Sequence, residues 1–173
     1  MNTPNEMNLR KIERASFLLR AVCTALLIPV VIIALAATGA ILAGLTAHIS
    51  YAGQTFIPAK MTLESRLVLA VVGLATGVVL FKGLLHLRRL AGNYMRREIF
   101  TADSAQQIRQ FGITCMLWGV IKLVWAFLPL AVSAGGSVAY VTTDAIMIGA
   151  VIVGLSWFAE MAAALREEND LTV

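Results

Sequence analysis

Two ionisable residues interrupt long apolar runs and are the first candidates for chemistry. Lys122 lies in LWGVIKLVWAF, and Glu160 lies in GLSWFAEMAAALR. A charged side chain in the middle of a bilayer costs about 3 kcal/mol on insertion scales, so such residues usually face the protein interior and find a partner. We therefore predict that Lys122 and Glu160 form an intramembrane charge pair, made directly or through a bridging water.

Small residues share a helical face with each of these charges. Small residues let helices approach closely, and indole rings beside an ammonium allow cation–π contact. The predicted cation–π partners of Lys122 are Trp118 and Trp125. The predicted helix-packing residues flank the charges or form a G-x-x-x-G pair: Gly73, Gly77, Gly119, Ala126 and Gly149.

Lys82 is a rival partner for Glu160, because the two residues have a similar predicted depth. It lies almost opposite Gly73 and Gly77 on its helix, so it reaches lipid phosphates if the glycine face packs inward. Three roles stay open for Lys122 and Glu160. They form a polar clamp that fixes helix register, part of a gated proton or ion path, or part of a ligand pocket.

Four membrane-spanning helices are the elements that must position these side chains. The chain has 173 residues, of which 59% are hydrophobic and 14% are charged, whereas soluble domains carry about 25% charged residues. Uncharged runs predict spans at about 21–47, 66–86, 110–132 and 144–165. The first run is too long for the core of a cleavable signal peptide, which is the rival interpretation. We predict an all-α fold, a single membrane domain over 1–173 that forms a bundle of four transmembrane helices.

Basic residues fix the predicted orientation. Eleven lie before the first span, in or beside the loop 87–109, or after the last span, and only Lys60 and Arg66 lie on the other side. Positively charged loops stay in the cytoplasm. We therefore expect both termini and the loop 87–109 to be cytoplasmic, and we read the net charge of +4 as a topology signal rather than a sign of direct nucleic-acid binding.

The cytoplasmic loop and the C-terminal tail are candidate partner-binding segments. Thr101 is a good helix N-cap, Asp103 suits the first turn, and Phe100 can staple onto that turn. This pattern fits a lead-in helix lying on anionic headgroups, or a recognition surface that includes the arginines before it. The tail, ALREENDLTV, is a frayed helix end, a docking peptide, or a segment that packs back onto the basic loop. The candidates are Arg96, Arg97, Phe100, Thr101, Asp103, Leu171, Thr172 and Val173.

The segments REIFTADSAQQIRQFG and LREENDLTV resemble a bacterial inner-membrane family catalogued as a domain of unknown function (two-nine-seven-five). Asp103-Ser104 stands where that family has Glu-Asn, and Arg97 stands where it has glycine. The resemblance implies four spans in the inner membrane and no established enzymatic activity. It also implies a partner, because such genes are often found beside a small helix-turn-helix regulator.

No catalytic or metal-binding motif accompanies these features. The sequence lacks Walker, G-x-S-x-G and H-E-x-x-H motifs, Cys23 and Cys115 form no CxxC pair, and His48 and His86 end spans on opposite sides. We predict no catalytic residues, metal or cofactor. The expected function is a non-catalytic membrane partner or regulator of a cytoplasmic, DNA-binding protein. The alternative is a small transporter or channel that uses Lys122 and Glu160, which requires a homo-oligomer or a polar cavity.

Overall fold

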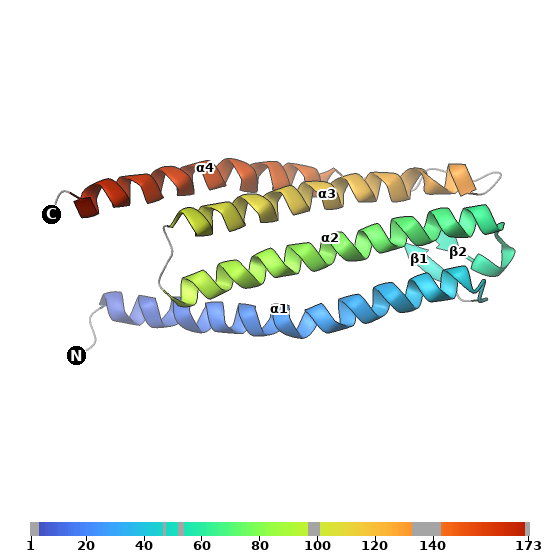
Figure 1. Cartoon of the computed structure of the whole chain (residues 1–173), viewed down its shortest axis with the longest axis horizontal. Coiled ribbons are helices and arrows are strands. Elements are labelled where there is room, and N and C mark those ends of the chain that lie inside the picture. Colours follow the sequence, from blue (N-terminus) through green and yellow to red (C-terminus); the bar gives the residue numbers. More distant parts are fainter. Residues whose placement is uncertain (1–3, 47, 52–53, 97–100, 133–142, 172–173) are drawn as a thin grey trace.

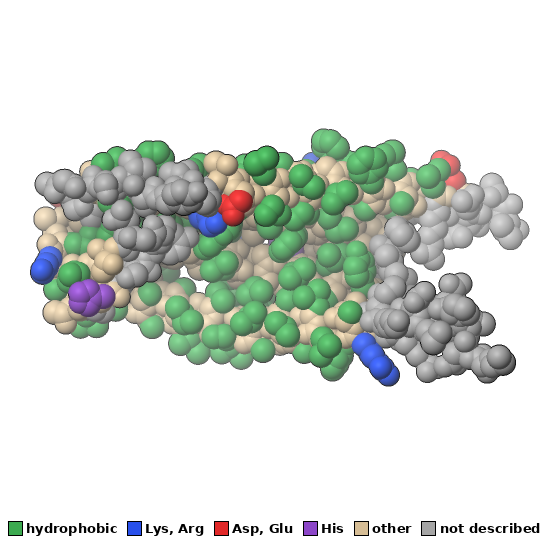
Figure 2. All heavy atoms as spheres, turned by 180° about the vertical axis from the view of Figure 1, so that it is seen from behind, with side chains coloured by type: hydrophobic (Ala, Val, Ile, Leu, Met, Phe, Trp, Pro, Cys, Tyr) green, Lys and Arg blue, Asp and Glu red, His purple; other side chains and the backbone are tan. Residues whose placement is uncertain are grey.

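The computed structural model describes residues 4–46, 48–51, 54–96, 101–132 and 143–171. Four helices dominate: α1 (Pro4–Leu42), α2 (Leu63–Met95), α3 (Ala102–Val132) and α4 (Asp144–Leu171). Each is long and apolar enough to cross a membrane, which confirms the prediction of an all-helical, multi-pass membrane protein. Apolar side chains cover most of the length of the face in Figure 2, as a lipid environment requires.

The helices lie side by side along one axis (Figure 1). They pack in chain order, α1 along α2, α2 along α3 and α3 along α4, so the bundle is open between α1 and α4. Both chain ends lie at the same end of the molecule, with Arg20, Arg88, Arg89 and Arg96; we call it the arginine end. A small hairpin lies at the opposite end, which we call the hairpin end.

The hairpin lies in what the sequence predicted to be a plain loop. Strands β1 (Ile49–Tyr51) and β2 (Gln54–Phe56) pair antiparallel with Ile49 opposite Phe56, and a short 3₁₀ helix, η1 (Pro58–Lys60), follows. Its register buries Phe56 against the Trp125 ring of α3, with ring centroids 5.9 Å apart. Trp125 also donates a hydrogen bond from Nε1 to Oγ1 of Thr76 on α2, at 2.9 Å. Phe56 and Trp125 belong to a cluster of buried apolar residues that also includes Ile41, Leu69, Ala70 and Leu128.

Local sequence signals set the helix ends. Thr101 accepts a hydrogen bond on Oγ1 from the Ser104 amide at 3.2 Å, which confirms the predicted N-cap of α3, and Thr62 caps α2 in the same way. Gly44, at φ 65°, ends α1: its amide and the Leu45 amide bond back to carbonyls of the last helical turn. This left-handed cap needs a glycine because a Cβ is disfavoured there.

Helices α3 and α4 meet along a seam of small residues spaced seven apart. A Cβ added at Gly149 would lie 2.7 Å from the Gly112 carbonyl oxygen, so the two backbones are in close contact. A seven-residue repeat keeps one face of a helix against its neighbour. The buried seam residues are Ala105, Gly112, Gly119 and Ala126 on α3 and Gly149, Ser156 and Ala163 on α4.

The seam fixes the register of α4 against α3. Contacts at the seam set Gly112 against Val153, Met116 against Gly149 and Gly119 against Ile146. Helix α4 therefore begins partway along α3 and continues past its first residue, as Figure 1 shows. At 1.5 Å per residue, the last eight residues of α4 extend about 12 Å beyond the start of α3.

Candidate functional site at the arginine end

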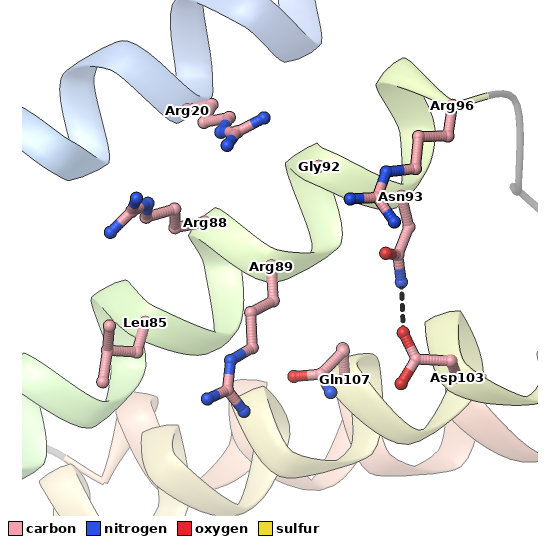
Figure 3. Close-up of a pocket in the computed structure, with 9 residues that line it drawn as sticks. All are labelled: Arg20, Leu85, Arg88, Arg89, Gly92, Asn93, Arg96, Asp103 and Gln107. Carbon is pink, nitrogen blue, oxygen red and sulfur yellow. Dashed lines mark hydrogen bonds between the residues drawn. The ribbon is translucent and has the colours of Figure 1, made fainter.

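A pocket of about 550 Å³ opens at the arginine end between α1, α2 and α3. Figure 3 shows its lining side chains, with Arg20 reaching from α1 toward α2 and Arg89 reaching from α2 toward α3. We call it the arginine pocket. Its lining residues are Arg20, Leu85, Arg88, Arg89, Gly92, Asn93, Arg96, Asp103 and Gln107.

One face of α2 supplies most of this lining. Six of the nine residues recur on α2 at steps of three and four, the spacing that puts side chains on one face of a helix. Arg20 comes from α1, just before the uncharged run that starts at Ala21. Asp103 and Gln107 come from the first two turns of α3, which the Thr101 cap holds in place.

Two side chains of α2, Asn93 and His86, form hydrogen bonds with side chains of α3 beside the pocket. Asn93 donates from Nδ2 to Oδ2 of Asp103 at 2.6 Å and to Oγ of Ser104 at 3.3 Å. Nδ1 of His86 lies 3.0 Å from Oε1 of Gln107, which accepts the hydrogen bond. Gln107 and Ser104 are buried, so the bonds to them are partly shielded from solvent, whereas the bond to Asp103 is exposed. These hydrogen bonds hold Asn93, Asp103 and Gln107 in place in the pocket lining and do not involve the guanidinium groups.

The charges of the arginine pocket are unbalanced. Four guanidinium groups line it, against the single carboxylate of Asp103. Among the side chains that the structure describes, no carboxylate lies within ion-pair distance of these four arginines. Arginine stays protonated at physiological pH and offers up to five donors in a planar fork. The arrangement is therefore suited to holding an anion, not to transferring a proton.

Gly92 leaves space in the middle of the arginine-bearing face of α2. A Cβ added there would meet no heavy atom within 4 Å, although the residues around it carry long side chains. The α2 backbone is therefore accessible from the pocket at this turn.

Lys122 pairs with a different carboxylate from the predicted one. Its Nζ lies 3.5 Å from Oδ1 of Asp144, and the Glu160 side chain is exposed. The predicted pair depends on residue 110 of α3 and residue 165 of α4 lying at the same depth in the membrane. The seam instead sets Glu160 level with Ala105, about 25 Å along the helix axis from Lys122. Helical periodicity had indicated a face for each charge, but it carries no information on axial register.

The two tryptophans predicted to lie beside Lys122 differ in their surroundings. Trp125 is turned to α2, through Thr76, and to the hairpin, through Phe56. Trp118 is half-buried one turn before Lys122. Lys82, the rival partner of Glu160, is exposed on α2 and lines an apolar groove between α1 and α2.

The predicted packing residues lie along two helix pairs, α3 with α4 and α1 with α2. Gly119 packs on Ile146 and Gly149 on Met116, both within the seam, where Ala126 is also buried. Gly77 packs on α1, since a Cβ there would lie 2.7 Å from Cβ of Ala34. Gly73 has open space instead and lines an apolar pocket of about 310 Å³ between α1 and α2.

Two of the predicted partner-binding residues, Arg96 and Asp103, line the arginine pocket. Thr101 caps α3 and Leu171 is the last residue of α4. The other four lie outside the described residues: Arg97, Phe100, Thr172 and Val173. Sequence reasoning missed the other seven lining residues, although the three-and-four spacing on α2 was a usable signal for five of them. The missed residues are Arg20, Leu85, Arg88, Arg89, Gly92, Asn93 and Gln107.

Within the described part of the chain, no three His, Cys, Asp or Glu residues gather in a way that could hold a metal ion. No family model matches the chain, and neither does any curated protein or solved structure with which it was compared. The resemblance to the four-span inner-membrane family therefore stays a prediction. Function has to be argued from the geometry of the site.

Proposed function

We propose that the protein is a non-catalytic protein of the bacterial inner membrane that engages a cytoplasmic partner protein through its arginine end. The observation that carries the proposal is that four arginines line one pocket at the end where both chain termini lie. An uncompensated basic surface attracts acidic partners and accelerates their association. A partner with an acidic patch is therefore the class that this end of the molecule fits.

The arginine end faces the cytoplasm in this proposal. The positive-inside rule supports this orientation, because eleven of the fourteen basic residues lie before the first predicted span, in or beside the loop 87–109, or after the last span. A single cysteine introduced at Arg96 in a Cys23→Ser, Cys115→Ser background should be shielded from a membrane-impermeant maleimide in intact cells. The same background with cysteine at Lys60, on the hairpin end, should be labelled, and the reverse pattern would contradict the orientation.

The end of α4 supplies the second part of the partner surface. Helix α4 extends beyond the start of α3 at this same end of the molecule, and the sequence of its last turns is rich in acidic residues. A partner that contacts both segments would need charges of both signs, which favours specificity over simple adhesion to basic surfaces. The specific candidate implied by the family resemblance is a small helix-turn-helix regulator, held at the membrane without contact between this chain and DNA.

Co-purification of a cytoplasmic protein from the native host tests the proposal. Cross-linked wild-type protein should retain the partner, and Arg96→Glu with Arg97→Glu should lose it, as should deletion of residues 171–173. Arg109→Glu is the matched control, since Arg109 is an exposed arginine of α3 that does not line the pocket. Absence of any cytoplasmic partner with wild type would refute the proposal, as would equal loss in the control.

The alternative of a small transporter or channel is less well supported. It requires Lys122 and Glu160 to share one path, within a homo-oligomer or a polar cavity, yet the two lie about 25 Å apart along the bundle axis. The seam between α3 and α4 is filled by backbone contact rather than by polar side chains. No second function is therefore proposed.

A further inference from the structure

We propose that the arginine pocket binds a phosphate group, carried by an anionic lipid or by a free phosphate compound. This binding would occur at the same end of the molecule as the proposed protein partner, but it does not depend on that partner. It gives the four guanidinium groups a ligand of defined chemistry.

The composition of the lining matches a phosphate better than a carboxylate. Guanidinium forks bind phosphate oxygens in pairs, and phosphate offers several oxygens to donors that arrive from different directions. Arg20 approaches from α1, while Arg88 and Arg89 leave α2 at adjacent positions, so donors surround the pocket on more than one side (Figure 3). With Asp103 already accepting from Asn93, the described lining keeps a clear excess of positive charge.

The size and floor of the pocket also fit a bound group. Its volume of about 550 Å³ lies within the range of about 300–1,000 Å³ that is usual for small-molecule sites. The space above Gly92 lets a ligand approach the α2 backbone between Arg88, Arg89 and Arg96. A Cβ at this position would meet no heavy atom within 4 Å, so a larger side chain here would extend into the pocket.

An apolar groove lies next to the pocket along α1 and α2. The groove has a volume of about 340 Å³ and an apolar lining that includes Val31, Leu35 and Phe81. Leu85 lines both the groove and the arginine pocket, so the two cavities are neighbours along α2. A headgroup phosphate in the pocket would place an acyl chain at the mouth of the groove. This proximity favours a lipid over a free phosphate compound as the source.

The test measures binding to the purified full-length protein in a neutral detergent by isothermal titration calorimetry. One arm uses short-chain phosphatidic acid, with phosphatidylcholine of the same chain length as the zwitterionic reference. A second arm uses inorganic phosphate and pyrophosphate. Binding of phosphatidic acid alone supports a lipid source, and binding of pyrophosphate or phosphate with equal affinity supports a free phosphate compound.

Two kinds of variant separate the pocket from general basic charge. Arg88→Gln with Arg89→Gln should weaken binding by about tenfold or more, because charge-assisted bonds are lost. Gly92→Leu should weaken it to a similar extent while leaving every charge in place. The matched controls are Arg14→Gln with Arg109→Gln for charge, and Gly154→Leu for a helical glycine with equally open surroundings.

The controls should bind within about twofold of wild type, which is small beside the tenfold step expected of one lost strong interaction. The proposal would be overturned if no anion bound better than phosphatidylcholine. It would also be overturned if the charge control lost as much affinity as the pocket double variant, or if Gly92→Leu bound as tightly as wild type. Circular dichroism of each variant shows that the helices are intact.

Discussion

Nζ of Lys122 lies 3.5 Å from Oδ1 of Asp144, the first residue of α4. The lysine is in the second half of α3, so the pair marks where α4 starts along its neighbour. Both side chains stay partly exposed, at 30% for Lys122 and 60% for Asp144, which places the pair at the rim of the helix contact. A carboxylate in the first turn also interacts favourably with the helix dipole. Asp144 thus interacts favourably both with the Lys122 ammonium group and with the dipole of α4.

A double-mutant cycle should detect coupling between Lys122 and Asp144. Lys122→Met and Asp144→Asn should each destabilise the protein, and the two together should cost about 1 kcal/mol less than the sum of the singles. Unfolding by sodium dodecyl sulfate in mixed micelles measures these free energies. Glu160→Gln is the control partner, because additivity with Lys122→Met is expected for groups about 25 Å apart. Coupling of Lys122 to Glu160 instead would show that the register of α4 is wrong.

The seam between α3 and α4 should tolerate no side chain at Gly149. Gly149→Ala places a Cβ 2.7 Å from the Gly112 carbonyl oxygen and from the Met116 amide nitrogen, both backbone atoms. We expect a loss of about 2 kcal/mol, since neither atom can move without shifting its helix. Gly154→Ala on the same helix meets nothing within 4 Å and should be neutral or slightly stabilising. Equal stability of both variants in the same micelle assay would argue against close packing here.

The hydrogen bond from Trp125 to Thr76 should contribute measurably to the packing of α3 on α2. Trp125→Phe keeps an aromatic ring near Phe56 but removes the Nε1 donor, and should cost about 1 kcal/mol. Adding Thr76→Val to that variant should cost less than Thr76→Val in wild type, because the bond is already absent. If the two Thr76→Val effects are the same size, the bond makes no net contribution.

Loss of the Thr101 cap should loosen the start of α3. Thr101→Ala removes the acceptor for the Ser104 amide, and caps of this kind are worth about 1 kcal/mol. Hydrogen exchange should increase most at the first turn of α3, beside the arginine pocket. Thr24→Ala is a suitable control, since Thr24 bonds only to a carbonyl of its own helix in an exposed setting and should change little. Unchanged exchange at residues 102–105 would contradict the role of the cap.

Residue patterns predicted the parts of this molecule that depend on local chemistry. Apolar run length revealed all four helices, and the Thr101 hydroxyl three residues before the Ser104 amide indicated where α3 begins. The sequence could not reveal how far α4 slides along α3, because each small residue of a seven-residue repeat looks like the next. Glu160 was therefore matched to Lys122, although Asp144 lies beside it.

The arginine pocket could not be predicted from the sequence, for a different reason. Arg88 and Arg89 entered the sequence argument only as topology signals, and Arg96 as a partner-binding candidate of the loop, although the three share one face of the α2 segment. Arg20 and Gln107 join them only through the packing of α1 and α3 on α2, which no local pattern predicts. The β1–β2 hairpin was missed because two strands of three residues are too short for alternation to be visible.

Packing in chain order has a consequence for how this protein is made. Helix α2 can dock on α1, α3 on α2 and α4 on α3, each as soon as it leaves the ribosome and enters the bilayer. The packing of each helix requires only the helix next to it in the sequence, because α1 and α4 do not pack along each other. Most tertiary contacts therefore join neighbours in sequence, a topology that keeps assembly fast. A chain halted after α2 would already hold the groove between α1 and α2, ready to accept lipid before synthesis is complete.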